Sequence, residues 1–158
     1  MNFQELKAYV LRALNVFYAR DSDLLSQRDE WAIAHRLAVY LEQEIPGWNV
    51  DCEYNKQGSD SDSKRDATGK RVRPDIALHH RQQSELQHNL LAVELKRFLE
   101  ELQHSNQEKK EISDLDKALR YTCPAEGEQT YQYQYGLALC FLPTLKCFWF
   151  RDGRQMQE

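Results

Sequence analysis

The segment NLLAVELKR (89–97) constrains the fold more than any other, because it is apolar on both faces and yet carries charged residues. A strand of this kind normally lies in the middle of a sheet that is covered on both sides. Side chains alternate along a strand, so Glu94 and Lys96 are predicted to share one face while Leu95 points to the other. Burying either charge alone is costly, so this face is expected to hold a partner, a metal ion or water.

The remaining patterns predict one α/β domain over residues 1–158, with a mixed sheet flanked by helices. Apolar residues from Phe3 to Phe17 recur at helical spacing, which predicts an N-terminal helix. A second helix is expected to begin near Ser26, where Ser26 and Asp29 resemble a capping box, and to end at Pro46. The other predicted elements are strands at 48–56, 73–80, 89–97, 131–142 and 145–150 and a helix at 113–123.

Composition narrows the classes of protein and of partner. A net charge of −4 excludes a broadly basic nucleic-acid coat protein, so any nucleic-acid contact must use a local patch. A run of basic residues before Asp75 is a candidate for this patch; the alternative is that the run is simply a solvated loop. Its residues are Lys64, Arg65, Lys70, Arg71 and Arg73. Without a membrane span or secretory pattern, a soluble cytoplasmic protein is expected. Four cysteines without a CxxC pair argue against structural zinc and for thiols in a reducing cytosol.

Asp75 is the natural partner of Glu94, because it lies near the start of the strand that precedes NLLAVELKR. If these strands are neighbours, the two carboxylates approach each other and repel unless a cation neutralises them. Hard oxygen ligands with room for water favour Mg²⁺ or Mn²⁺ over zinc. The alternative is a structural ion pair with Lys96.

Glu30 is a further candidate on the second helix. It precedes Ala34, Leu37 and Leu41 at helical spacing, which places it on the core-facing stripe. An acid in the first turn is also favoured by the helix dipole, so the two explanations compete.

Pro74-Asp75, followed after 18 residues by Glu94-Leu95-Lys96, resembles the signature of the PD-(D/E)xK, or restriction-endonuclease-like, nuclease superfamily. The predicted element order over about residues 26–142 also resembles the αβββαβ core of that family, here with an extra N-terminal helix. The resemblance implies a Mg²⁺-dependent (or Mn²⁺-dependent) nuclease that acts on nucleic acid, with DNA as the expected substrate.

The same resemblance assigns roles to particular residues. Asp75, Glu94 and the backbone carbonyl of Leu95 would hold the metal ion, Glu30 would complete its ligand shell, and Lys96 would position the attacking water. The helix at 113–123 often contacts substrate in that family, which makes Lys117 a candidate for nucleic-acid binding.

Two other functions remain open from the sequence. A catalytically inactive module of the same fold could bind nucleic acid or protein, and a small-molecule phosphohydrolase would need a closed pocket. A homodimer that uses the N-terminal helix is a further hypothesis, because cutting both strands often needs two copies. Tyr131, Tyr133 and Tyr135 form a one-sided stripe that predicts core or edge packing, or less often a base-stacking platform.

Overall fold

A mixed sheet forms the centre of the protein in the computed structural model, which describes residues 1–27, 29–54, 65, 71, 73–105, 113–124 and 131–157. The sheet has six strands in the order β1-β2-β3-β4-β5-β6. Strands β3 and β4 are parallel, and all other neighbours are antiparallel. The strands are β1 (Asn49–Cys52), β2 (Ile76–His79), β3 (Asn89–Phe98), β4 (Tyr135–Leu142), β5 (Lys146–Arg151) and β6 (Arg154–Gln155).

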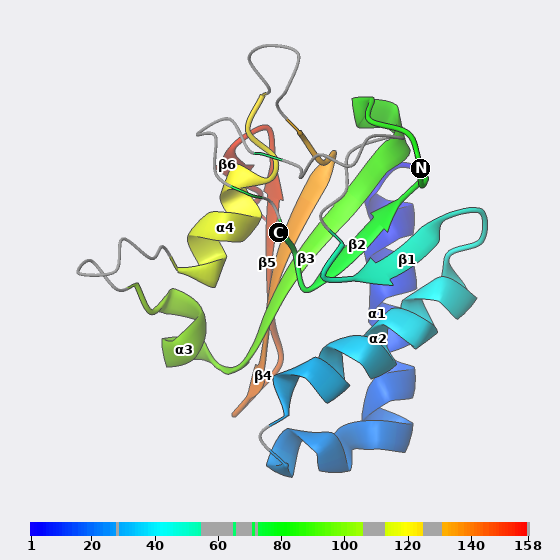
Figure 1. Cartoon of the computed structure of the whole chain (residues 1–158). Helices are drawn as coiled ribbons and strands as arrows, with labels where there is room; N and C mark the ends of the chain where they lie inside the picture. Colours follow the sequence, from blue (N-terminus) through cyan, green and yellow to red (C-terminus); the bar gives the residue numbers. More distant parts are fainter. Residues whose placement is uncertain are drawn as a thin grey trace.

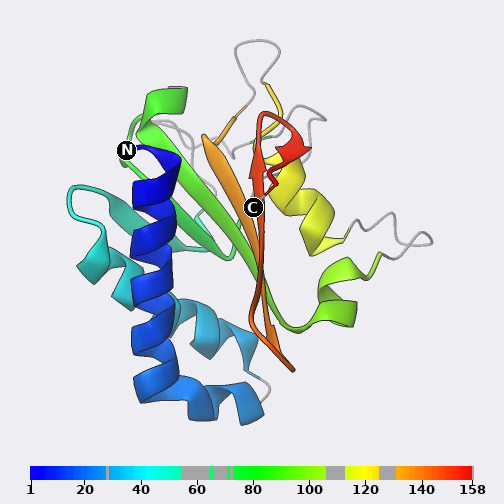
Figure 2. The ribbon, with the colours of Figure 1, turned by 180° about the vertical axis from the view of Figure 1, so that it is seen from behind.

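Helices cover both faces of this sheet (Figure 1). On one face lie α1 and α2, and Figure 2 shows α1 running along the back of the sheet. On the other face lie the shorter α3 and α4. The helices are α1 (Phe3–Asp21), α2 (Glu30–Glu44), α3 (Leu99–Gln103) and α4 (Asp114–Arg120), with 3₁₀ turns at Ser22–Ser26 and Leu86–His88. The α/β class and the helix-flanked mixed sheet are therefore confirmed.

Strand β3 is the buried centre of the sheet, as its double-sided apolar pattern predicts. Leu91, Val93 and Leu95 pack into the core beneath α1 and α2. Ala92 packs on the opposite face, in a cluster with tyrosine side chains. Glu94 follows Ala92 on this second face and is 3% exposed.

The pairing between β2 and β3 stops before β3 ends. Its last pair is Ile76 with Val93, whereas β3 continues beside β4 as far as the pair of Phe98 with Leu142. The sheet therefore forks at Asp75 and Glu94, which lie opposite each other where the ladder stops.

Helix α4 lies very close to β4 on the face that carries Glu94. A Cβ atom added to Gly136 would lie 2.2 Å from the backbone oxygen of Ala118. Any side chain at position 136 would thus push the helix away from the strand. This contact sets the height of α4 above the sheet.

Several predicted boundaries are wrong for identifiable reasons. Helix α2 begins at Glu30 and not near Ser26, because Asp29 is itself the cap and accepts from the N–H of Ala32 at 3.1 Å. Strand β4 begins only at Tyr135, so the tyrosine stripe is split between two faces. Tyr131 and Tyr133 join the cluster with Ala92, and Tyr135 packs under α1.

Other predicted features differ in extent. Strands β1 and β2 are shorter than 48–56 and 73–80, and α3 and β6 carry no pattern that predicted them. All four cysteines are in the thiol form. None of the helices in the described part of the chain combines the length and apolar character needed to cross a bilayer.

Candidate metal and catalytic site

Asp75 lies at the fork, directly before β2. Its Oδ2 accepts a hydrogen bond of 2.8 Å from the N–H of Leu95. This N–H lies just beyond the last β2–β3 pair, so the carboxylate replaces the missing strand partner. Burial raises the pKa of Asp75 to about 6, although the Leu95 N–H and the charge of Lys96 oppose this shift.

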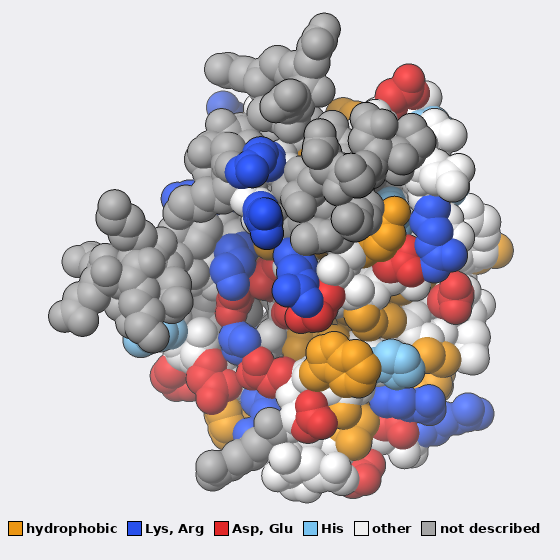
Figure 3. Space-filling view, viewed as in Figure 1, with side chains coloured by type: hydrophobic (Ala, Val, Ile, Leu, Met, Phe, Trp, Pro, Cys, Tyr) orange, Lys and Arg blue, Asp and Glu red, His pale blue; other side chains and the backbone are white. Residues whose placement is uncertain are grey.

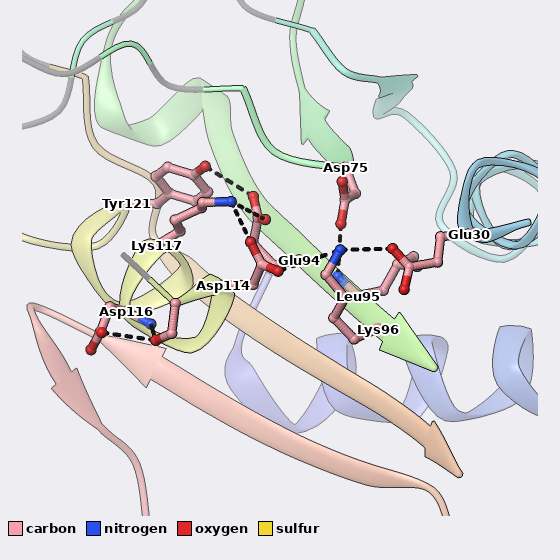
Figure 4. Close-up of polar contacts among 10 residues, drawn as sticks. Glu30, Asp75, Glu94, Leu95, Lys96, Asp114, Asp116, Lys117 and Tyr121 are labelled. Atoms are coloured by element: carbon pink, nitrogen blue, oxygen red, sulfur yellow. Dashed lines mark hydrogen bonds and ion pairs between the residues drawn. The ribbon is translucent and has the colours of Figure 1, made fainter. Parts of the chain in front are cut away.

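Glu94 lies opposite Asp75 and faces α4 (Figure 4). The hydroxyl of Tyr121 donates to its Oε1 at 2.9 Å, and the Nζ of Lys117 lies 3.8 Å from its Oε2. Complete burial, and then the charge of Asp75, raise the pKa of Glu94 well above its ordinary value. Asp75 and Glu94 therefore lie close enough at the fork for the charge of one to act on the other, as the expected pairing of their strands predicts.

Lys96 extends from β3 between the first turns of α2 and α4. Its Nζ is 2.7 Å from Oε2 of Glu30 and 3.5 Å from Oδ2 of Asp114. Burial lowers the pKa of Lys96, but the hydrogen bond with Glu30 and the charge of Asp114 outweigh burial and raise it. These contacts favour the charged ammonium form of Lys96 at this site.

The sequence left two explanations for Glu30, a residue that points to the site and an acid favoured by the helix dipole. Its position in the structure agrees with both. It stands in the first turn of α2, and its side chain reaches across to the site. The capping role belongs to its neighbour Asp29. The carboxylate of Glu30 is thus available as a partner for Lys96 rather than for its own helix.

Asp114 is the site residue that sequence reasoning missed. It is 8% exposed and forms ion pairs with both Lys96 and Lys117. Because Asp114 follows Ser113, its position in the sequence is typical of an ordinary acid at the start of a helix. Ser113 does cap α4, since its hydroxyl oxygen accepts from the N–H of Asp116. The available signal is the spacing of Asp114, Lys117 and Tyr121, which places all three on one helical face.

Four carboxylates and two ammonium groups meet here, which leaves a formal excess of two negative charges. Among the described residues, no three or more histidine, cysteine or acidic side chains are arranged as a ready metal site. Asp75 and Glu94 nevertheless fit a hard divalent ion, because Mg²⁺ often binds through one or two carboxylates and keeps several waters. Burial is the main cause of their raised pKa values, and the negative charge of neighbouring acids adds to it.

Leu95 contributes its N–H to Asp75, and its carbonyl remains a predicted ligand only. Glu53, which directly follows β1, is exposed and pairs with Arg73.

The predicted basic patch is described only in part. Arg65 and Arg71 form an isolated antiparallel bridge, and both side chains are exposed. Lys64 and Lys70 lie outside the described residues. Lys117 reaches the acidic cluster itself. Figure 3 shows basic side chains gathered between α4 and β2, with acidic side chains beside them.

Three histidines stack on or hydrogen-bond to neighbouring side chains. His79 is buried, and its Nε2 lies 2.9 Å from Oδ2 of Asp51. His80 stacks on Trp48 at a ring separation of 4.2 Å. His35 is exposed and stacks on Trp31, away from the cluster.

The fold and this cluster together define a mixed α/β domain with an acid–lysine site at a fork in its sheet. The chain matches no protein-family model, no curated protein and no solved structure.

Proposed function

We propose that the protein is a metal-dependent nuclease of the PD-(D/E)xK type. The observation that carries this proposal is the convergence of Asp75, Glu94 and Lys96 at one fork between neighbouring strands. The order of α2, β1, β2, β3, α4 and β4 supports it, because this is the order of the αβββαβ core. DNA is the proposed substrate, and exposed Arg65, Arg71 and Arg73 are proposed phosphate contacts.

Asp75, Glu94 and the Leu95 carbonyl would hold Mg²⁺ or Mn²⁺, which supplies an acidified water and shields charge on the phosphate. Lys96 would orient the attacking water and stabilise negative charge that develops on the phosphate. Its raised pKa suits electrostatic stabilisation better than proton abstraction, because the group stays charged at neutral pH. Glu30 and Asp114 hold the ammonium group in place from two helices.

A catalytically inactive module is the second candidate, and the ion pairs favour it. Lys117 already neutralises part of the charge of Glu94 and Asp114, so the cluster is partly satisfied without a metal ion. Such a module would bind nucleic acid or a partner protein without cleavage. It would also show no saturable binding of Mn²⁺ in calorimetry.

The deciding experiment is a nicking assay on a negatively supercoiled plasmid, which contains both duplex and locally unpaired segments, with and without Mg²⁺ or Mn²⁺. The wild-type protein should nick DNA only with metal, and Lys96→Ala should lower the rate by a factor of about 100 or more. Lys146→Ala, which removes an exposed lysine on β5, serves as the matched control and should leave the rate unchanged. Metal-dependent nicking that persists in both Lys96→Ala and Asp75→Asn would exclude this site as its source.

A further inference from the structure

A hollow of about 540 Å³ opens beside the acid–lysine site, at the N-terminal end of α2. Its walls come from the start of α2, the end of β3 and α3. Glu30 belongs both to this wall and to the ion pair with Lys96, so the hollow adjoins the site directly. The lining residues are Asp29, Glu30, Arg97, Phe98 and Glu101.

Two flat side chains form one wall of the hollow. Phe98 is 36% exposed, although it lies at the end of a central strand. The guanidinium carbon of Arg97 lies 5.1 Å from the centre of this ring. Arg97 is also fixed, because its Nε donates to the backbone oxygen of Leu25 at 2.8 Å. Aromatic rings and guanidinium planes are the surfaces on which unpaired nucleobases stack.

Apart from Arg97, the polar part of the wall consists of carboxylates. Asp29, Glu30 and Glu101 surround the hollow with negative charge, and Figure 3 shows acidic side chains gathered around α3. This charge repels phosphate groups, so the hollow does not suit the backbone of a nucleic acid. Carboxylates accept hydrogen bonds from the amino groups of bases, as in acidic contacts with the N4 group of cytosine.

We infer that this hollow binds an unpaired nucleobase with an exocyclic amino group, next to the phosphate that is cleaved. This inference rests on the proposed nuclease function and deepens it. The substrate is accordingly single-stranded or locally unpaired nucleic acid, because a base inside a duplex is stacked between its neighbours and has no free face to lie on Phe98. Cytosine is preferred over thymine, which has no amino group to donate.

The test measures binding rather than cleavage. Fluorescence anisotropy with short deoxycytidine and deoxythymidine oligonucleotides, in Ca²⁺ instead of Mg²⁺, gives affinities without turnover. The wild-type protein should bind the deoxycytidine oligonucleotide more tightly than the other and more tightly than a duplex. Phe98→Ala should weaken this binding about fivefold or more. Phe98→Leu keeps the apolar bulk, preserves the fold and should also weaken binding.

Two further variants sharpen the test. Glu101→Gln should reduce the preference for cytosine, because an amide can donate as well as accept. Trp31→Ala is the matched control, since Trp31 is a 60% exposed aromatic residue on α2 that does not line the hollow. Melting curves check that each variant is folded.

The results separate this inference from the function on which it rests. The hollow is not the base site if both Phe98 variants bind the oligonucleotide as tightly as the wild type, or if only Trp31→Ala weakens binding. Equal affinity for duplex would overturn the single-stranded substrate. Tight, Phe98-dependent binding without metal-dependent cleavage would remove the nuclease function and leave the base site.

Discussion

At the scale of single residues, the burial of Asp75 and Glu94 costs folding free energy, and the cost at Asp75 can be followed by pH. The folded protein raises the pKa of this carboxyl from 3.8 to about 6, so ionisation opposes folding. Between about pH 4 and about pH 6 the folded state binds more protons than the unfolded state. The free energy of unfolding therefore falls as the pH rises through this range.

Asp75→Asn removes this penalty and retains an acceptor for the N–H of Leu95. The variant should be more stable than the wild type by about 1–3 kcal/mol at neutral pH, with the difference vanishing near pH 4. Urea denaturation across this pH range measures the effect. If the difference in free energy of unfolding between the wild type and Asp75→Asn is the same at pH 4 and at pH 7, the predicted cost of burying Asp75 is wrong.

Tyr121→Phe tests the contact between α4 and Glu94. The change removes a buried 2.9 Å hydrogen bond to a carboxylate and should lower the free energy of unfolding by about 1–2 kcal/mol. Tyr18→Phe is the matched control, because its hydroxyl makes only a 3.4 Å contact with a backbone oxygen. Similar losses in the two variants would show that the contact with Glu94 has no special weight.

Strand alternation is sufficient to predict that Glu94 and Lys96 share a face and that Asp75 can join them. It cannot identify Asp114, because that residue reaches the site through the packing of a separate helix. Sequence spacing on α4 gives its direction around the helix axis, but not which strand the helix covers. The two lysine contacts of Asp114 depend on this tertiary arrangement.

At the scale of elements, the contact between α4 and β4 controls the geometry of the site. Gly136 allows the helix to approach the strand, and the helix then brings Lys117 and Tyr121 over Glu94. A displacement of α4 would move both side chains together. The packing of one glycine is thus coupled to the electrostatics of a buried acid.

Gly136→Ala should lower the free energy of unfolding by about 1–3 kcal/mol, because the added methyl group overlaps the Ala118 carbonyl. Gly47→Ala provides a comparison without overlap, since nothing lies within 4 Å of the added atom and only its φ of +84° causes strain. Gly47→Ala should cost about 1 kcal/mol. Thermal unfolding of both variants distinguishes the two mechanisms, and a harmless Gly136→Ala would contradict the close approach.

Long periodic elements were predictable, and short ones were not. In α1 the apolar residues repeat at helical spacing over the whole helix, and in β3 both faces are apolar, so many residues support the same assignment. The sequence predicts too early a start for α2, because Ser26 and Asp29 resemble a capping box, whereas Asp29 alone caps the helix. The two-residue strand β6 has no pattern of its own and forms through pairing with β5.

At the scale of the whole molecule, the uncompensated charge predicts a response to divalent metal ions. Mn²⁺ at about 100 times its dissociation constant should raise the free energy of unfolding by about 2.7 kcal/mol. For a chain of this length, the melting temperature should rise by about 5–10 °C. Asp75→Asn should show little or no shift, which provides the control. An equal shift in this variant would place the bound ion elsewhere.

The fork between β2 and β3 has a consequence for variation in this chain. If β2 began two residues earlier, main-chain pairing would engage the N–H of Leu95 from which Asp75 now accepts a hydrogen bond. The acids and the lysine would all still be present, but the carboxylate of Asp75 would no longer be held against β3. A change of strand length alone, with every charged side chain retained, would therefore release the carboxylate on which the proposed metal site depends.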